Sequence, residues 1–198
     1  MTNETKWSID PAHSDIEFKV RHMMIAHVKG KFKTFDASIY TAGNDFLTAD
    51  IDLWIDAASI STGDSQRDEH LKSEDFFDVR NHKQITFTAN TIGKMLPEDN
   101  HELWGDLTMK GITKNIKLNI QFGGIANDSY GNEKAGFTVT GMIKRSDWGL
   151  VWNAATETGG VMVSDEIYIT CEIELINKGK RDLTMELKNS SDKKSYAL

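Results

Sequence analysis

Apolar and polar residues alternate along much of this chain, and this alternation constrains the fold more than any other feature. In residues 116–122, Ile, Leu, Ile and Phe are separated by Lys, Asn and Gln. Residues 167–175 repeat the pattern, and 16–20, 51–55, 85–88 and 137–143 repeat it over shorter lengths. One dry and one wet face is typical of an antiparallel sheet, whereas buried parallel strands are apolar throughout. The sequence therefore predicts an all-β protein of antiparallel strands.

Turn-forming sequences separate the alternating segments, as in TAGND at 41–45 and NDSYGN at 127–132. Roughly eight or nine strands spaced by such turns indicate a sandwich or a barrel. Closure into a barrel removes unpaired edges, and a barrel of about eight strands can hold one small ligand. The stretches 28–40 and 165–176 exceed the usual strand length of ~5–6 residues. We therefore expect an extended antiparallel β-barrel, whose interior is either an open tunnel or a packed core.

The stretch RDEHLKSEDFFD at 67–78 interrupts this pattern with a run of charged side chains. Residues 61–75 show no period-2 alternation, and Ser, Thr or Asp near their start is a typical helix cap, which predicts a short helix near 64–75 between two strands. Runs of charge usually face solvent, so the main interpretation is a helix anchored on the sheet by Leu71, Phe76 and Phe77. The alternative is a polar group at a cavity mouth, formed by Arg67, Asp68 and His70.

Length and charge exclude several classes of protein. The 198 residues fit one domain, and the net charge of −7 argues against nucleic acid and against attachment to anionic membrane surfaces. No apolar run approaches the ~20 residues of a membrane span. The N-terminus, MTNETKWSID, has no secretory signal pattern. We expect the chain as given to be cytoplasmic, and periplasmic if a leader has been removed.

Nothing in the spacing of reactive residues predicts catalysis or a metal site. The six histidines match no ligand template, since His22 and His27 are five residues apart. Ser14 follows His13 directly, and adjacent residues of an extended segment point to opposite faces. The single cysteine, Cys171, excludes an internal disulfide and lies at an inward position, as expected of a small apolar core residue. The predictions are no catalytic residue, no metal and no enzymatic activity.

Five segments, taken in order, resemble one known family. They are WSIDPAHSDIEFKVRHMMIAHVKGKF, TGDSQRDEHLKSEDFFDVRNHKQITFTA, GDLTMKGITKNIKLNI, GFTVTGMIKRSDWGL and VSDEIYITCEIELI, which together run from Trp7 to Ile176. The chain is similar to the YceI-like family, bacterial lipocalin-like proteins associated with polyisoprenoid binding. It departs from that family at Asn115, where proline is common, and in lacking the secretory signal that many members carry.

The resemblance implies a lipocalin-like barrel domain over residues 1–177, followed by a charged tail over 178–198 that is partly disordered. It implies a long-chain amphipathic lipid as partner, an isoprenoid such as a prenyl quinone or polyprenyl phosphate, or a fatty-acid-like lipid, with no other cofactor. It also suggests a homodimer, for which Trp54 and Tyr168 offer outward aromatic side chains. The candidates for contact with the lipid head group are His13, His22, Arg67, Asp68, His70 and Arg145. The candidates for the tunnel lining are Phe18, Val20, Phe32, Leu53, Ile55, Phe87, Leu107, Leu118, Ile120, Phe137, Val139, Ile143, Trp148, Ile167 and Ile169.

Three functional hypotheses follow from these residues. The first is a non-enzymatic carrier that holds the lipid chain inside the barrel. The second is a metal-dependent or acid–base enzyme that uses His and carboxylate side chains at the barrel mouth. The third is an interaction module whose barrel is filled by its own side chains.

Overall fold

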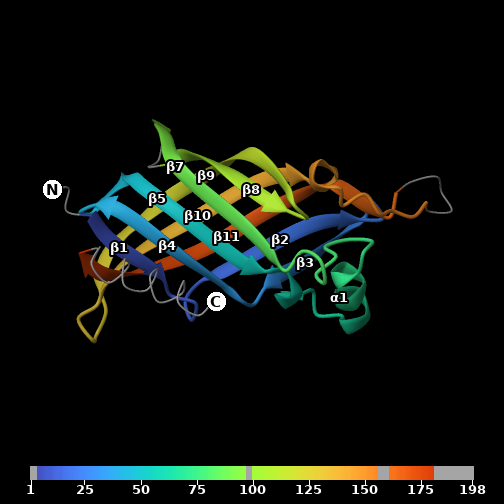
Figure 1. The fold of residues 1–198 in the computed structure, drawn as a ribbon, viewed down its shortest axis with the longest axis horizontal. Helices are drawn as coiled ribbons and strands as arrows, with labels where there is room; N and C mark the ends of the chain where they lie inside the picture. The colour runs from blue at the N-terminus through green and yellow to red at the C-terminus, as the bar shows by residue number, and fades with distance from the viewer. Residues whose placement is uncertain (1–3, 97–99, 156–160, 181–198) are drawn as a thin grey trace, which may run out of the picture.

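The structure is a computed structural model that describes residues 4–96, 100–155 and 161–180. Eleven strands form one antiparallel sheet, together with one α-helix and two short 3-10 helices (Figure 1). The strands are β1 (Glu4–Ile9), β2 (Asp15–His22), β3 (Ala26–Phe32), β4 (Phe35–Ala42), β5 (Asp45–Asp56), β6 (Ile60–Ser61), β7 (Gln84–Leu96), β8 (Asn100–Met109), β9 (Ile112–Asn127), β10 (Glu133–Lys144) and β11 (Val163–Lys180). The helices are η1 (Ala57–Ser59), α1 (Ser65–Lys72) and η2 (Arg145–Trp148).

Eight of these strands close into a barrel. Their order is β1-β4-β5-β7-β8-β9-β10-β11, and the pairing of β1 with β11 completes the ring. All the strand pairs among the described residues are antiparallel, and closure of the ring pairs the edges that an open sheet would expose. The prediction of an extended, lipocalin-like antiparallel barrel of about eight strands is confirmed.

Strand β11 holds the barrel together because it pairs along one edge with two strands in succession. Its C-terminal part pairs with β1, where Ile9 faces Leu175, and its N-terminal part pairs with β2, where Asp15 faces Glu172. Beyond that point β2 continues into β3, which pairs with the short β6. The sheet therefore branches away from the barrel at one end.

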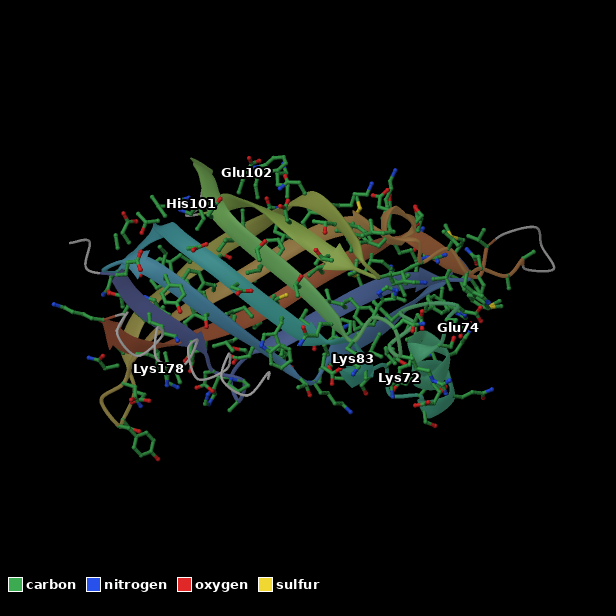
Figure 2. The ribbon with its side chains drawn as sticks, in the orientation of Figure 1. Lys72, Glu74, Lys83, His101, Glu102 and Lys178 are labelled. Carbon is green, nitrogen blue, oxygen red and sulfur yellow. The ribbon has the colours of Figure 1, made fainter. Side chains whose placement is uncertain are left out.

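The two ends of the barrel differ (Figure 1). The helix end carries α1, the β2–β3 turn and residues 145–155, whereas the hairpin end carries the β4–β5 and β9–β10 turns. Lys72 and Glu74 lie with α1 at the helix end, and Lys178 lies at the opposite end (Figure 2). No helix among the described residues is long and apolar enough to cross a membrane.

The predicted continuous strand over 28–40 is wrong, because the chain bends between β3 and β4. Phe32 and Phe35 are both buried although they are three residues apart, and a regular strand would point them to opposite faces. Because the strand is interrupted at Lys33 and Thr34, the side chain of Phe35 is buried again at the start of β4. By contrast, the long strand expected over 165–176 lies within β11.

The last strand runs three residues into the segment predicted as a charged tail. Residues 178–180 belong to β11, which ends at Lys180, so the predicted boundary at 177 lies inside a strand. The remainder of that predicted tail, residues 181–198, lies outside the described residues.

The predicted helix is present as α1, and Asp64 caps it. The carboxylate of Asp64 accepts a 3.0 Å hydrogen bond from the backbone N–H of Arg67. This bond satisfies one of the amide groups that the first turn of a helix leaves without a partner, and it lowers the pKa of the Asp64 carboxyl. A short helix that buries none of its own residues therefore has a fixed start.

Candidate functional site: an apolar cavity closed by a helix

The inward faces of the strands enclose a cavity of about 280 Å³. Apolar side chains of the barrel strands form almost all of its wall, as the alternation requires. The charged residues of the wall are Glu17 and Arg145, and Glu17 belongs to the exposed face of β2. The interior can accept a hydrocarbon chain and offers almost nothing to a polar one.

Fourteen of the fifteen side chains expected in the tunnel line this cavity. The exception is Trp148, which is 1% exposed and donates a hydrogen bond from its indole Nε1 to the carbonyl oxygen of Leu107 at 3.0 Å. Its placement in the tunnel is corrected, because Trp148 belongs to η2, where the chain turns after Lys144 and the strand pattern ends. The fourteen are Phe18, Val20, Phe32, Leu53, Ile55, Phe87, Leu107, Leu118, Ile120, Phe137, Val139, Ile143, Ile167 and Ile169.

Aromatic rings fill the hairpin end of the barrel. Phe46 lies 4.9 Å from Phe137 and 5.7 Å from Phe122, between ring centroids, and Phe122 lies 5.2 Å from Phe137. Trp7 adds a fourth ring, 4.9 Å from Phe46. Such tilted and edge-on contacts are favourable between aromatic rings. This end of the cavity is therefore closed by side chains of the barrel itself.

At the helix end, α1 and the residues after it close the cavity. Leu71, Phe76 and Phe77 all line it, and the ring of Phe77 packs edge-on against Phe32 at 5.9 Å. These three residues were expected to anchor the helix. Because these three side chains cover one end of the apolar cavity, we call α1 and the residues that follow it as far as Phe77 the lid.

The lid is joined to the segment after η2 through an aromatic contact. The ring of Trp152 lies 4.7 Å from His70 and 5.3 Å from Phe76. His70 also lies 3.0 Å from the carboxylate of Asp75, through its Nε2. His70 therefore holds the lid together and does not line the cavity.

Two charged residues of α1 fasten it to Thr62, just after β6. Asp68 accepts hydrogen bonds from the backbone N–H and the hydroxyl of Thr62, at 2.8 and 2.6 Å. Arg67 donates to the hydroxyl and the carbonyl oxygen of the same residue, at 2.7 and 3.0 Å. Both head-group candidates are thus engaged in positioning the helix, and neither lines the cavity.

Arg145 is the one head-group candidate that lines the cavity. Its guanidinium is buried and donates hydrogen bonds to the carbonyl oxygens of Leu150, Trp152, Val163 and Ser164. Among the described residues, no carboxylate lies within ion-pair distance of Arg145, and burial lowers its pKa. A buried positive charge, surrounded by carbonyl oxygens and attracted at longer range by Asp165, therefore lies at the helix end of an apolar cavity.

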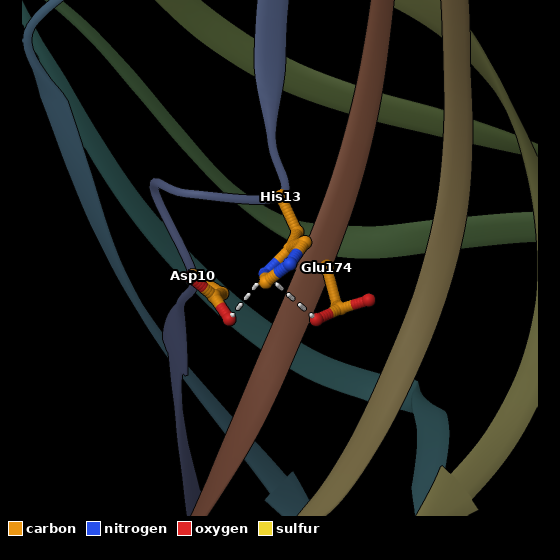
Figure 3. A group of neighbouring side chains, drawn as sticks. All are labelled: Asp10, His13 and Glu174. Atoms are coloured by element: carbon orange, nitrogen blue, oxygen red, sulfur yellow. Dashed lines mark hydrogen bonds and ion pairs between the residues drawn. The ribbon is translucent and has the colours of Figure 1, made fainter. Parts of the chain in front are cut away.

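The two remaining candidates do not join Arg145. His22 ends β2 at the helix end, beside Val163 of β11, and does not line the cavity. His13 lies on the outer wall, 61% exposed, with its Nδ1 3.0 Å from Asp10 and 3.6 Å from Glu174 (Figure 3). Its proposed role beside the opening is corrected, because the turn after β1 faces outward.

Asp10, His13 and Glu174 form a group that sequence spacing did not reveal. Their ligand atoms lie within 4.8 Å of one another, a distance that suits a metal ion. Lys134 fills the same space, however, because its Nζ lies 2.9 Å from Asp10 and 2.7 Å from Glu174. The hydrogen bond from Lys134, followed by that from His13, lowers the pKa of Asp10 to about 2. A metal ion would have to displace the ammonium group.

Sequence reasoning also missed Trp152 and the ring cluster of Phe46 and Phe122. Trp152 lies in an irregular segment, where no period assigns a face. Phe46 has the inward phase of Ala49 and Ile51 only once the three extra residues of β5 are known, since the register with β4 shifts there. The proximity of Asp10, Lys134 and Glu174 depends on pairings between β1, β10 and β11 that sequence spacing does not contain.

A closed eight-stranded barrel with an apolar interior and a helical lid defines a lipocalin-like class of protein. The YceI-like domain matches residues 7–175, and the chain belongs to this family. A UPF0312 protein of Staphylococcus aureus is 37% identical over 171 residues, which cover 86% of this chain and 96% of that protein. The resemblance to this family is therefore confirmed.

Two solved structures share the fold. The YCEI protein of Campylobacter jejuni is 33% identical with a TM-score of 0.63, over 87% of this chain and 96% of that one. A polyisoprenoid binding domain from Saccharophagus degradans has a TM-score of 0.61 over 86% of this chain and 98% of that one. At 17% identity, the second similarity concerns the fold alone.

Proposed function

We propose that this protein is a non-enzymatic binding protein for a long-chain amphipathic lipid, with an isoprenoid chain as the preferred occupant. The observation that carries the proposal is the cavity of about 280 Å³, whose wall is apolar except near Arg145. Burial of one methylene group contributes about 0.8 kcal/mol, so ten would contribute about 8 kcal/mol, which corresponds to micromolar affinity. Such binding needs no reactive group.

The position of Arg145 supports an anionic head group. An isoprenoid phosphate or a fatty-acid carboxylate would bring a negative charge toward a guanidinium that has no carboxylate partner among the described residues. A quinone head would be held only as a hydrogen-bond acceptor. A hydrogen bond from the guanidinium is charge-assisted with either head group, but only an anionic head group adds the attraction between opposite charges. Of the two isoprenoids considered, a polyprenyl phosphate therefore fits better than a prenyl quinone.

The relatives agree with this proposal. The Saccharophagus degradans neighbour is described as a polyisoprenoid binding domain, and it has the same barrel. A barrel filled by its own side chains, the interaction-module hypothesis, would not leave a cavity of this size. An acid–base or metal-dependent reaction would use Asp10, His13 and Glu174, but these lie on the outer wall and would gain nothing from the apolar interior.

The first test is lipid binding by a barrel whose cavity is blocked. Val139 lines the cavity, and its neighbour Thr140 is exposed on the same strand. Protein purified without detergent is expected to yield a long-chain lipid on organic extraction, and to take up a fluorescent long-chain probe saturably. Val139→Trp should abolish uptake, whereas Thr140→Trp should retain it. Absence of both extracted lipid and saturable uptake in the wild type would refute the proposal.

The second test concerns the head group and leaves Arg145 unchanged, because its four main-chain contacts make substitution a risk to folding. A fatty acid and the alcohol of equal chain length should both displace the probe. The acid is expected to bind about tenfold more tightly, since only it places a negative charge beside the guanidinium. Equal affinities would show that Arg145 has no role in head-group recognition.

A further inference from the structure

The positive charges of this acidic protein are concentrated on one hairpin. Residues 18–35, which include β3 and the part of β2 that follows Asp15 and Glu17, contain five Lys and Arg residues and no Asp or Glu, although the net charge is −7. Lys19 faces Lys29 across the two strands, and Arg21 faces His27. Like charges directly opposite each other destabilise a sheet, so this arrangement is not explained by the stability of the fold.

Most of these charges are available to a partner. Lys31 pairs with Asp15 at 2.9 Å, but Arg21, Lys29 and Lys33 are exposed and form no ion pair among the described residues. On the neighbouring strand β11, Asp165 is bonded to Ser146 and Glu166 accepts a hydrogen bond from Tyr168. On the hairpin itself the five exposed cations outnumber the two exposed acids, Asp15 and Glu17, so its outer face carries a net positive charge.

The tip of the same hairpin is apolar and exposed. The N–H of Ile25 donates to the carbonyl oxygen of His22 at 3.1 Å, and φ is +50° at Met23 and +61° at Met24. Turns with two such residues usually contain Asn-Gly, because a side chain disfavours positive φ. Here two methionines occupy the strained positions, and the side chain of Ile25 is 83% exposed. Strained backbone and exposed apolar groups often coincide at functional sites.

This tip lies beside the end of the cavity that the lid closes. The N–H of Met23 donates to the carbonyl oxygen of Met162 at 2.8 Å, and the next residue, Val163, lines the cavity. Two further exposed side chains, Val151 and Val161, come from the neighbouring segments. We call the exposed side chains of Met23, Met24, Ile25, Val151 and Val161 the apolar rim.

The net charge of −7 disfavours attachment of the molecule as a whole to anionic membranes, but the local charge of this hairpin is positive. We propose that the apolar rim and the basic hairpin dock this protein on an anionic phospholipid bilayer. A convex apolar tip flanked by cations suits the membrane interface, where the tip enters the acyl boundary and the cations meet anionic head groups. A second copy of the chain is a poorer partner, since its hairpin carries the same charges. This inference rests on the proposed function in one respect. If the cavity holds a water-insoluble lipid, that lipid must pass between the bilayer and the cavity, and docking brings the two together.

The test is flotation of the full chain with lipid vesicles. Binding is expected to vesicles containing phosphatidylglycerol, to weaken in high salt, and to be absent with phosphatidylcholine alone. Arg21→Gln and Lys29→Gln should each weaken binding about fivefold, the effect of removing one cation near an anionic surface. Lys178→Gln, at the opposite end of the barrel (Figure 2), is the matched control and should bind as the wild type does.

The decisive variant is Met23→Asn with Met24→Gly. It removes the apolar tip and installs the residues that this turn prefers, so thermal stability should be unchanged or raised. Vesicle binding should fall at least tenfold. Tyr130→Ser, which removes an exposed aromatic residue at the hairpin end, should have no effect. Undiminished flotation of the double variant, or a change in oligomeric state in place of lost flotation, would overturn the proposal.

Uptake of a long-chain probe in the absence of vesicles separates this proposal from the previous one. The double variant should take up the probe as the wild type does, because the cavity is intact. A wild-type protein that takes up probe but does not float would overturn docking and leave lipid binding intact. A protein that floats but takes up no probe would support docking and refute lipid binding.

Discussion

The indole Nε1 of Trp7 donates a 3.0 Å hydrogen bond to Oγ1 of Thr41, and both side chains are almost completely buried. The pair joins β1 to β4 next to the rings that close the hairpin end. Thr41→Val keeps the shape of the side chain but leaves the indole N–H without an acceptor and the carbonyl oxygen of Gly43 without the hydroxyl that donates to it. We expect a loss of about 1–3 kcal/mol in the free energy of unfolding, the usual result for a buried unsatisfied donor, measured by urea denaturation.

Thr41→Ser is the control for this prediction. It retains the hydroxyl acceptor and removes only a methyl group, so it should be less damaging than Thr41→Val. Equal stability of Thr41→Val and the wild type would show that the hydrogen bond contributes nothing to the fold.

The ion pair between Asp10 and Lys134 makes stability depend on pH in acid. Hydrogen bonds from Lys134 and His13 lower the pKa of Asp10 from 3.8 to about 2. The folded state therefore favours the carboxylate, and its contribution is complete above the unfolded pKa and is lost as the pH falls toward 2. At 1.36 kcal/mol per pKa unit, this contribution is about 2 kcal/mol.

Chemical denaturation measures this effect when it is repeated at several pH values between about 5 and 2. An acidic group of this kind titrates over about this range. The wild type should lose stability across this interval more steeply than Asp10→Asn, whose amide does not titrate. The variant should already be less stable at neutral pH. Parallel curves for the two proteins would contradict the assignment of the pKa shift to this ion pair.

The cavity wall could be predicted from sequence because strand alternation assigns a face to each residue without knowledge of the partner strand. Val139 and Ile169, for example, come from β10 and β11 and meet at the same wall because both are in the inward phase. The same reasoning fails where the period ends. Trp148 was misplaced because it lies in η2, where the chain turns and strand alternation assigns no face.

Arg145 shows a second limit of the sequence. Its guanidinium is fixed by carbonyl groups of Leu150, Trp152, Val163 and Ser164, which lie in irregular chain or at the start of β11. The pattern of residues gives no means of predicting that these carbonyls converge. The head-group candidates were accordingly too many, since charge and proximity in sequence do not reveal which side chains face the interior.

Cys171 is expected to be unreactive in the folded protein. Burial in the barrel wall raises the pKa of its thiol to about 12, so the thiolate that reacts with disulfide reagents is scarce at neutral pH. Treatment of the native protein with an aromatic disulfide reagent should release no coloured thiolate over minutes. The same protein in denaturant should react with one equivalent, since it contains one cysteine. Rapid labelling of the native protein would show that this wall opens.

The hydrogen bonds between Asp68 of α1 and Thr62 can be tested by measuring how firmly they keep the lid in place. Asp68→Ala removes the acceptor of two hydrogen bonds from Thr62, one of them from its backbone N–H. Hydrogen exchange at the amide of Thr62 should therefore become at least about tenfold faster, since a hydrogen bond to a charged group contributes about 1.5–3 kcal/mol. A lid held less firmly should also release a bound long-chain probe faster, as measured by stopped-flow dilution into excess acceptor vesicles.

Glu69→Ala provides the matched control, because Glu69 is the next residue of α1, is exposed, and pairs only with Lys72 of the same helix among the described residues. It removes a similar charge without touching Thr62, so exchange at Thr62 and probe release should stay at wild-type rates. Faster exchange with unchanged release in Asp68→Ala would show that the helix moves without opening the cavity, and the ligand would then leave by another route. Unchanged rates for both processes would mean that the apolar contacts of Leu71, Phe76 and Phe77 alone hold the lid closed.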